Sequence, residues 1–339
     1  MAEIKNYYHN KIILVTGGAG SIGSEIVRKL LKCNPETVRI LDNRELAVFT
    51  LMQNLQSRKI RPFIGDVRDE KRVEAAMQGA DIVFHTAALK HVPLSEYNSI
   101  EAVRTNILGT QNIMTSAIHL KVKKVINIST DKVVNPINIM GATKLVAERL
   151  ITNAHFYLGK TSKTIFCSVR FGNILYSNGS VAQIFKQQIQ GGGPVTLTSQ
   201  EATRFFMSMS KAVDFIIRAG ELAEGREVFI PRMPALRIRD LAQVMIEEFS
   251  PRFGKNPKDI EIKIVGIRPG EKIHESMITE EETVLIKETK DMFVLRYPDS
   301  IMQLGSGATR KNYSSKKLPL LNKKQLRELL LSEEYTDPV

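Results

Sequence analysis

Hydroxyl, carboxylate and amine side chains follow one another in the segment STDKVVNPINIMGATK, residues 129–144. Thr130, Asp131 and Lys132 come directly after KKVINIS, a short apolar and β-branched run that predicts a parallel strand. Polar groups at the carboxyl end of such a strand are where an open α/β sheet binds its ligand. A carboxylate beside an amine can donate and accept protons in turn. The segment therefore predicts a site for proton-transfer chemistry; the alternative is a helix cap or a surface ion pair.

Met140 and Lys144 form a second pair of interest in this segment, because they lie one helical turn apart. We expect both side chains on one face of a helix that opens near Met140. A thioether cannot be protonated or act as a base at any useful pH. If Met140 faces a substrate, another group has to take up the substrate's proton.

The strand expected at KIILVTG ends in a glycine-rich turn and continues as the helix EIVRKLLK. Glycines in such a turn allow a tight bend, a close approach of backbone to pyrophosphate and close packing of the helix on the sheet. The amino terminus of the helix then faces the phosphates. A second strand, TVRILD, ends in an acid, and together these features predict a dinucleotide site. The turn residues assigned to it are Gly17, Gly20, Ser21, Ile22 and Gly23.

The acid that ends TVRILD is Asp42, which is placed to accept a hydrogen bond from an adenosine ribose 2′-hydroxyl. A carboxylate would repel a 2′-phosphate, so NAD is favoured over NADP, and Arg44 keeps NADP as the less favoured alternative. A structural role is favoured over a catalytic one for Asn106, in a long helix expected over 99–119. Further cofactor contacts are expected near the strand ends, at Asn43, Asp66, Val67, Ala87, Ala88, Lys90, Asn106 and Ser129.

Six alternations of strand and helix in the first part of the chain predict an α/β fold with a doubly wound parallel sheet of the Rossmann type. Residues 1–173, with parts of 210–232, are assigned to an NAD-binding domain. Residues 174–299, without the returning segment, are assigned to a smaller mixed α/β substrate lobe. Residues 300–339 are expected to form a tail with a final helix. The sequence contains no flexible linker and no internal repeat, so we expect the lobe to pack on the first domain.

The composition, 43% hydrophobic and 25% charged residues in 339, is that of a soluble globular protein. No apolar run approaches the ~18–20 residues of a membrane span and no signal peptide opens the chain, so we expect a cytoplasmic protein without membrane contact. The net charge of +12 is scattered, which favours an anionic small substrate over nucleic acid. Cys33 and Cys167 are expected as buried free thiols, and no metal site is expected.

Several motifs together resemble extended short-chain dehydrogenases/reductases that act on nucleotide sugars: TGGAGSIG, HTAALKHVP, STDK, MGATK, RFGNI, TRFFM and RPGEK. More narrowly, they resemble the CapD-like UDP-N-acetylglucosamine 4,6-dehydratases of polysaccharide biosynthesis, over residues 10–295. The resemblance implies oxidation at carbon 4 by NAD, loss of water across carbons 5 and 6, and return of the hydride to carbon 6. Because larger family members carry a membrane-spanning amino-terminal region, the resemblance also implies a soluble short form.

In this family pattern Asp131 protonates the departing 6-hydroxyl and Lys132 is the base at carbon 5. Such a base has to be neutral for part of the time, so its pKa must be lowered by burial or by the charges of Lys90 and Lys144. The pattern also assigns Lys144 to the nicotinamide ribose. The wider superfamily has a tyrosine where this chain has Met140, whereas a branch of the dehydratases resembles this chain in carrying methionine there.

Without that tyrosine, the proton of the 4-hydroxyl is expected to pass to Asp131, to Thr130 or to an ordered water. The resemblance also suggests residues for the UDP-sugar. Guanidinium groups pair bidentately with phosphate, so Arg204 and Arg268 are candidates for the diphosphate, although each could be a solvated surface charge. The other substrate contacts assigned are Lys90, His91, Arg170, Asn173 and Glu271.

Two other functions stay open. A nucleotide-sugar 4-epimerase shares the fold and cofactor but returns the hydride to carbon 4. A catalytically silent regulator would bind NAD and turn over no UDP-sugar. For the dehydratase we expect retention at carbon 5, because methionine-bearing relatives often retain, and we expect a homo-oligomer.

Overall fold

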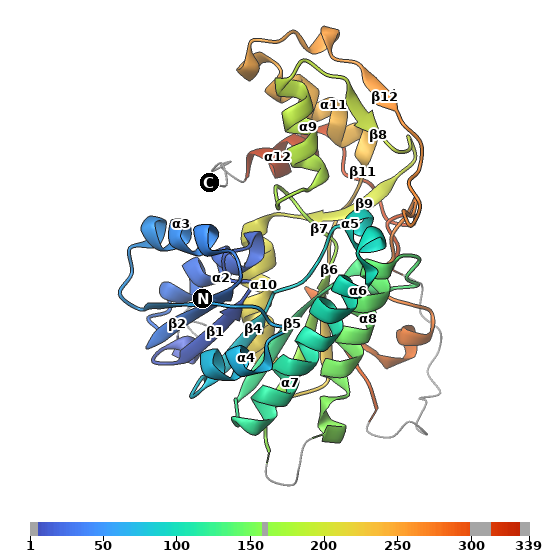
Figure 1. The fold of residues 1–339 in the computed structure, drawn as a ribbon. Helices are drawn as coiled ribbons and strands as arrows, with labels where there is room; N and C mark the ends of the chain where they lie inside the picture. The colour runs from blue at the N-terminus through green and yellow to red at the C-terminus, as the bar shows by residue number, and fades with distance from the viewer. Residues whose placement is uncertain (1–5, 158–161, 299–312, 333–339) are drawn as a thin grey trace.

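The computed structural model describes residues 6–157, 162–298 and 313–332. Within these residues the strands form one nine-stranded sheet, one three-stranded sheet and one two-stranded sheet (Figure 1). The parts of the expected carboxyl-terminal tail at 300–312 and 333–339 lie outside the described residues. No helix in the described part of the chain is long and apolar enough to cross a bilayer.

The nine-stranded sheet confirms the predicted doubly wound α/β fold. Its strand order is β13-β14-β10-β6-β5-β4-β1-β2-β3. In this order the strands from β10 to β3 run parallel, β14 pairs antiparallel with β10, and the edge strand β13 pairs antiparallel with β14. Strands such as β4 are buried along their whole length, as a parallel sheet covered on both faces requires. The bounds are β1 (Ile12–Thr16), β2 (Thr37–Asp42), β3 (Ile60–Ile64), β4 (Ile82–His85), β5 (Lys124–Thr130), β6 (Ile165–Phe171), β10 (Glu227–Pro231), β13 (Ile286–Glu288) and β14 (Met292–Arg296).

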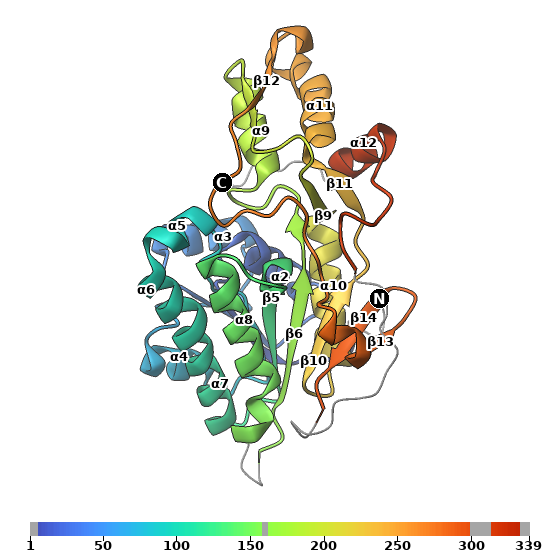
Figure 2. The same ribbon diagram turned by 90° about the vertical axis from the view of Figure 1, so that its right-hand side faces the viewer.

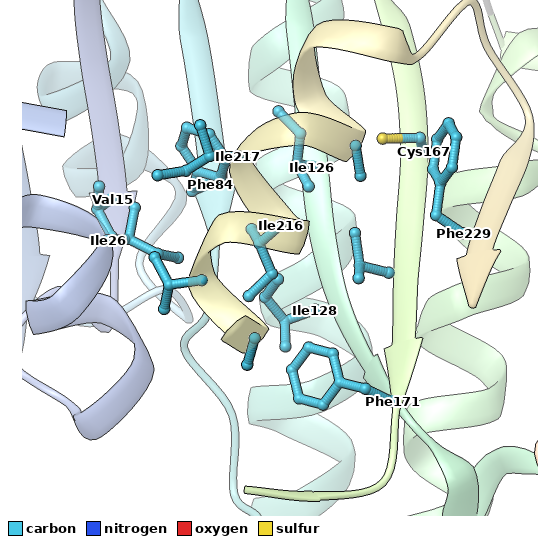
Figure 3. Packing of buried hydrophobic residues seen from close by; sticks show 14 of the residues in the cluster. Val15, Ile26, Phe84, Ile126, Ile128, Cys167, Phe171, Ile216, Ile217 and Phe229 are labelled. Atoms are coloured by element: carbon cyan, nitrogen blue, oxygen red, sulfur yellow. The ribbon is translucent and has the colours of Figure 1, made fainter. Parts of the chain in front are cut away.

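Helices cover both faces of this sheet. One face packs against α2 (Ser21–Leu31), α3 (Glu45–Leu55) and α10 (Met209–Leu222), and the other against α4 (Glu70–Met77), α7 (Gly109–His119) and α8 (Ile139–Thr152). Figure 3 shows the first interface, where Ile216 and Ile217 of α10 lie against Ile126 and Phe84 of the strands. Cys167 lies in the same cluster, and both it and Cys33 are buried, as expected. The core thus holds the carboxyl ends of β1, β4 and β5 in fixed positions.

The helix expected over residues 99–119 is divided into three parts. It consists of α6 (Ser99–Ala102), a π-helical turn η1 (Val103–Leu108) and α7, and the short helix α5 (Val92–Tyr97) precedes it. Asn106 lies on the π-helical turn, where its side chain accepts from the backbone N of Leu89 and donates to the backbone O of the same residue. Such turns frequently occur at functional sites. This one fixes the loop that carries Lys90.

A smaller lobe lies over the carboxyl ends of the strands of the large sheet. In Figure 2 the strand β6 points toward this lobe. Its core contains Phe185, Phe206, Leu241 and Leu326. Its elements are β7 (Asn173–Ile174), α9 (Val181–Gln190), β8 (Val195–Leu197), β9 (Thr203–Met207), β11 (Ala235–Arg237), α11 (Ile238–Phe249), β12 (Ile262–Ile264) and α12 (Lys323–Leu331). Short 3-10 turns are η2 (Asp131–Val133), η3 (Ala154–Tyr157), η4 (Pro251–Phe253), η5 (Pro257–Asp259) and η6 (Glu281–Leu285).

The structure corrects one boundary. Strands β13 and β14, which the sequence assigned to the lobe, form the outer edge of the large sheet. The physical reason is the return of β10 to the sheet beside β6, which leaves an open edge that β14 covers by antiparallel pairing.

Candidate active site

The glycine turn between β1 and α2 has the shape of a dinucleotide cradle. Gly17 has a positive φ of 63°, and a Cβ on it would lie 2.8 Å from the backbone N of Ala87 at the end of β4. A Cβ on Gly23 would collide with the carbonyl oxygen of Gly17. Gly20 is the N-cap of α2 and provides no side-chain cap. The amino-terminal N–H groups of α2 therefore face a backbone-lined turn, which fits a pyrophosphate.

Asp42 at the end of β2 is anchored to this turn. Its buried carboxylate accepts from the backbone N of Ala19 at 3.1 Å and pairs bidentately with Arg44 at 3.0 Å. Further along the same edge, Asp66 accepts from Asn43 at 3.1 Å. Val67 is buried, and Ala87 and Ala88 are half-buried. The structure brings these residues together at one edge of the sheet, and their contacts with a cofactor stay a prediction.

The turn that follows β5 places a carboxylate inside the protein. Asp131 is fully buried, and its Oδ1 accepts from Lys132 Nζ at 2.9 Å and from the Thr130 hydroxyl at 3.0 Å. Its Oδ2 accepts no hydrogen bond from any described residue. Oδ2 lies against Gly172, 3.3 Å from where a Cβ would stand. Thr130 is only half-buried, so its hydroxyl is the outer end of this short hydrogen-bonded chain.

The pKa of Lys132 differs from what the sequence reasoning required. Burial works against its charge, but the carboxylates of Asp131 and Glu275 outweigh burial and raise the pKa of Lys132. By contrast, the pKa of Lys90, lowered by partial desolvation and by the charge of Lys132, is about 8. Burial lowers the pKa of Lys144 to about 8 as well. In this state Lys132 therefore holds its proton.

Helix α8 packs against the turn that carries Lys132. A Cβ on Gly141 would collide with the carbonyl oxygen of Lys132, so only glycine permits this approach. Asn138 caps the helix by accepting from the backbone N of Gly141 at 2.7 Å. Met140 is buried in the first turn, and Lys144, one turn later, donates to the carbonyl of Ile128 at 2.5 Å. Met140 and Lys144 thus occupy successive turns beside the end of β5, as their spacing predicts.

Two predicted ligand contacts are corrected. Ser129 and Arg170 are register partners on β5 and β6, and both side chains enter a buried cluster. Ser129 donates to Glu148 at 2.5 Å, and Arg170 pairs with Glu148 at 2.5 Å and with Glu282 at 2.8 Å. Arg170 is 0% exposed. Side chains alternate along a strand, so Ser129 points away from the position that Thr130 occupies.

Residues 268–275, here called the strap, dock on the turn after β5. Lys272 donates to the carbonyl of Val134 at 2.6 Å, and Asn138 donates to the carbonyl of Gly270 at 2.7 Å. Arg204 of β9 holds the strap from the other side, because it donates to the carbonyls of Lys272 and Ile273 at 2.7 and 2.9 Å.

In this region the structure corrects one substrate assignment, and two others stay predictions. Arg204 is only 7% exposed and directs its guanidinium to backbone carbonyls, which corrects its assignment to the diphosphate. Arg268 is exposed on the strap. The carboxylate of Glu271 accepts a hydrogen bond from the Thr198 hydroxyl at 2.7 Å, so one of its oxygens already has a partner within the protein.

The loop 175–180 lies between the glycine turn and the segment after β4. The backbone N of Asn178 donates to the Ser21 hydroxyl at 3.0 Å. His91 packs so closely on Gly179 that a Cβ there would collide with the imidazole ring. Asn173, at the start of β7, has a buried Oδ1 that accepts no hydrogen bond from the described residues.

Two residues of this region were missed by the sequence reasoning. His85 bridges Thr16 and Thr110 at 2.8 and 3.0 Å, and burial lowers its pKa to about 3, so it is neutral. Glu275 is buried at the end of the strap, and burial and the charge of Asp131 raise its pKa. The sequence carries a weak signal for His85, which ends a buried strand. It carries none for Glu275.

A dinucleotide cradle on a doubly wound sheet, with Lys144 one turn into the helix after β5, defines an α/β protein of the extended short-chain dehydrogenase/reductase type. The family model described as "polysaccharide biosynthesis protein" matches residues 13–297. The chain belongs to this family of polysaccharide biosynthesis proteins.

Full-length similarity extends to several proteins. A Methanocaldococcus jannaschii protein named "uncharacterized membrane protein MJ1061" is 53% identical, over 98% of this chain and 99% of that protein. A UDP-N-acetylglucosamine 4,6-dehydratase (inverting) of Campylobacter jejuni is 37% identical over 95% of this chain and 98% of its own length. A UDP-glucose 4-epimerase of Rickettsia rickettsii is 35% identical over 96% of this chain and 97% of its own length.

Among solved structures, Pen from Bacillus thuringiensis is similar with a TM-score of 0.90 and 41% identity, over 97% of this chain and 99% of that chain. DesIV from Streptomyces venezuelae, a dTDP-glucose 4,6-dehydratase solved with NAD bound, has a TM-score of 0.68 and 23% identity, over 77% of this chain and 86% of its own. The likeness to DesIV shows a shared fold.

Proposed function

We propose that this protein catalyses the NAD-dependent 4,6-dehydration of UDP-N-acetylglucosamine to a UDP-4-keto-6-deoxy-hexosamine, which makes it a hydro-lyase. The observation that carries the proposal is the pair of fully buried Asp131 and half-buried Lys132, 2.9 Å apart, at the end of β5. Elimination of water needs an acid for the leaving hydroxyl and a base for the adjacent carbon, and this pair supplies both kinds of group. The similarity to a protein named as such a dehydratase supports the choice of substrate.

NAD is the cofactor that the cradle fits best, because the carboxylate of Asp42 stands where a 2′-phosphate would be repelled. The glycine turn and the amino terminus of α2 would hold its pyrophosphate, and Lys144 its nicotinamide ribose. When bound, NAD accepts a hydride from carbon 4 and later returns it to carbon 6. NADP is less favoured, although Arg44 lies beside the turn.

The 4-hydroxyl proton leaves through Thr130. Asp131 is fully buried, whereas Thr130 is half-buried and already donates to Asp131 Oδ1 at 3.0 Å. Thr130 can therefore accept the substrate proton while it passes its own proton to Asp131. This relay does the work that Met140 cannot do. Asp131 is then neutral and holds the proton that the departing 6-hydroxyl needs.

Elimination then uses both members of the pair. Once Asp131 is neutral, Lys132 gives its ammonium proton to solvent, to which its side chain is 24% exposed. The neutral amine then removes the carbon 5 proton, and Asp131 returns its proton through Thr130 to the leaving hydroxyl, so that water departs. Return of the carbon 5 proton by Lys132 to the same face would give retention. That expectation stays a prediction, and the Campylobacter relative is named as inverting.

The direct test is to incubate the purified protein with UDP-N-acetylglucosamine and NAD and to determine the product by mass spectrometry and NMR. We expect the loss of one water molecule and a 4-keto-6-deoxy product whose carbon 5 configuration NMR reports. In deuterated water, Lys132→Ala should abolish exchange at carbon 5, whereas the exposed control Lys287→Ala should exchange at the wild-type rate. Wild-type exchange in Lys132→Ala would remove the base role.

A 4-epimerase is the second candidate, and the similarity to a protein named UDP-glucose 4-epimerase favours it. An epimer of unchanged mass in the same experiment would establish that activity. NAD binding without any turnover would instead support a catalytically silent regulator. The expected homo-oligomer stays a prediction, which sedimentation of the purified chain would test.

A further inference from the structure

Asn138 joins two elements of the site through its side-chain amide. Its Oδ1 accepts from the backbone N of Gly141 at 2.7 Å and so caps α8, and its Nδ2 donates to the carbonyl of Gly270 on the strap at 2.7 Å. A helix N-cap needs only an acceptor, which aspartate and serine supply equally well. The amide nitrogen of Asn138 therefore adds a contact that capping does not require.

The strap approaches α8 closely at this point. Gly270 has a positive φ of 77°, and a Cβ on it would lie 2.9 Å from the Cβ of Asn138, so a side chain there would be both strained and crowded. The same turn carries Arg268 and Glu271, because the backbone N of Glu271 donates to the carbonyl of Arg268 at 3.1 Å. Asn138 thus holds the backbone between the two strap residues that are predicted to contact the substrate.

A second contact joins the strap to the turn after β5. Lys272 donates to the carbonyl of Val134 at 2.6 Å, and the backbone N of Val134 donates to the carbonyl of Asp131 at 3.1 Å. Arg204 of β9 holds the strap from the lobe, through the carbonyls of Lys272 and Ile273. The strap therefore extends from the lobe to the turn that carries Asp131.

Dehydration as proposed above requires that one substrate molecule is held at both ends. The hexose has to reach Asp131 and Lys132, while the nucleotide is expected to contact Arg268 and Glu271. Binding energy from the part of a substrate that does not react serves to orient the part that does. A misplacement of about 1 Å can lower the rate about 100-fold. The position of the strap relative to the turn after β5 therefore matters for the rate of the reaction.

We propose that Asn138 is a positioning residue, which fixes the strap to the turn after β5 so that a nucleotide bound by the strap presents its hexose to Asp131 and Lys132. The partners of the amide establish its orientation, because Gly141 offers an N–H and Gly270 a carbonyl. Asn138 acts through the strap and takes no part in proton transfer. The inference rests on the proposed dehydration.

Asn138→Asp tests this role, because a carboxylate still caps α8 but cannot donate to the carbonyl of Gly270. Asn138→Ser also keeps a cap and removes the amide donor, and it adds no charge. We expect kcat to fall about 10-fold or more in both variants, because the hexose is no longer held in line with the reacting pair. The affinities for UDP and for NAD and the urea midpoint should change little, because the strap keeps its own side chains and its contacts with Arg204.

The matched control is Asn322→Asp, which makes the same substitution at the N-cap of α12. Asn322 accepts there from the backbone N of Gln325 at 3.0 Å, and the control should leave kcat unchanged. Wild-type kcat in both Asn138 variants would overturn the proposal. A loss of kcat in Asn138→Asp alone would overturn it equally, since the added charge would then be the cause. Weaker UDP binding at unchanged kcat would overturn it as well, because Asn138 would then serve binding and not positioning.

Hydrogen exchange of the backbone amides, measured by mass spectrometry, separates this test from that of the function. Without substrate, the peptide that covers the strap should exchange several-fold faster in both variants than in the wild type, whereas the peptide that covers α8 should keep its protection. This result is expected even if the chain dehydrates no UDP-sugar. Unchanged exchange in the strap would refute the link through Asn138.

Discussion

Replacing Arg170 with methionine should make the protein much less stable to unfolding, although it removes no substrate contact directly. Arg170 is fully buried, and its guanidinium bridges Glu148 of α8 and Glu282 of η6. Methionine retains much of the side-chain volume but leaves two buried carboxylates without a counter-charge. The effect is therefore expected in the free energy of unfolding.

The size of the effect follows from the ion pairs. Burial opposes the charge of Glu282, but hydrogen bonds and the charge of Arg170 outweigh it and lower its pKa from 4.5 to about 2. At about 1.4 kcal/mol per pH unit, this corresponds to roughly 3 kcal/mol for Glu282 alone. Breaking a buried ion pair from one side costs about 3–5 kcal/mol. We expect Arg170→Met to lose about that much.

Urea unfolding at several pH values measures this loss. The wild-type contribution of Glu282 is present above pH 4.5 and is lost as the pH falls toward about 2. In Arg170→Met the unpaired carboxylates favour the protonated form, so the variant should gain stability as the pH falls from about 7 to about 5. The matched control is Arg104→Met, which removes an exposed pair with Glu101 and should cost below about 1 kcal/mol. Equal costs for the two variants, or wild-type stability with a raised KM in Arg170→Met, would refute the assignment.

Two further predictions concern the cofactor side. Gly23→Ala forces a methyl group onto the carbonyl of Gly17. Calorimetry should therefore show loss of NAD binding and a stability cost of about 1–3 kcal/mol. In the control Gly191→Ala the new methyl group meets its neighbours at an ordinary 3.5 Å, so this variant should bind NAD normally. The pKa of Lys144 is lowered by burial to about 8, so its burial cost is present below that pH and is relieved as the pH rises toward 10.5. Lys144→Met should therefore be more stable than the wild type at pH 7 without NAD. The difference in unfolding free energy between the two proteins should narrow by about pH 10. A difference that stays constant with pH would contradict the lowered pKa of Lys144.

Local patterns made much of the fold predictable. Short apolar runs in the sequence predicted the parallel strands, and the spacing of Met140 and Lys144 predicted that they lie one helical turn apart. The direction of Ser129 also follows from strand alternation once Thr130 is assigned to the cleft. The error over Arg170 arose because its partners, Glu148 and Glu282, come from distant segments, and no local pattern indicates an internal pairing.

Glu275 shows why the electrostatics of the site could not be predicted from the sequence. It belongs to the strap, which docks on the turn after β5 from more than a hundred residues later in the chain and is held by Arg204 and Lys272. The expected lowering of the Lys132 pKa considered burial and the cations Lys90 and Lys144, but no carboxylate. In the folded chain the carboxylates of Asp131 and Glu275 outweigh burial and raise the pKa of Lys132.

The absence of a tyrosine at position 140 changes where the first proton has to be stored. A tyrosine would exchange protons at the cleft surface, whereas in the proposed dehydration the proton would pass through Thr130 to Asp131, which is 0% exposed. Stored on Asp131, that proton is kept from bulk water and is available again when the 6-hydroxyl leaves. The same event removes the negative charge that held Lys132 as an ammonium ion. In the proposed dehydration, oxidation at carbon 4 would thus prepare both the acid and the base for elimination. A buried aspartate next to a lysine suits this order of steps better than an exposed pair would.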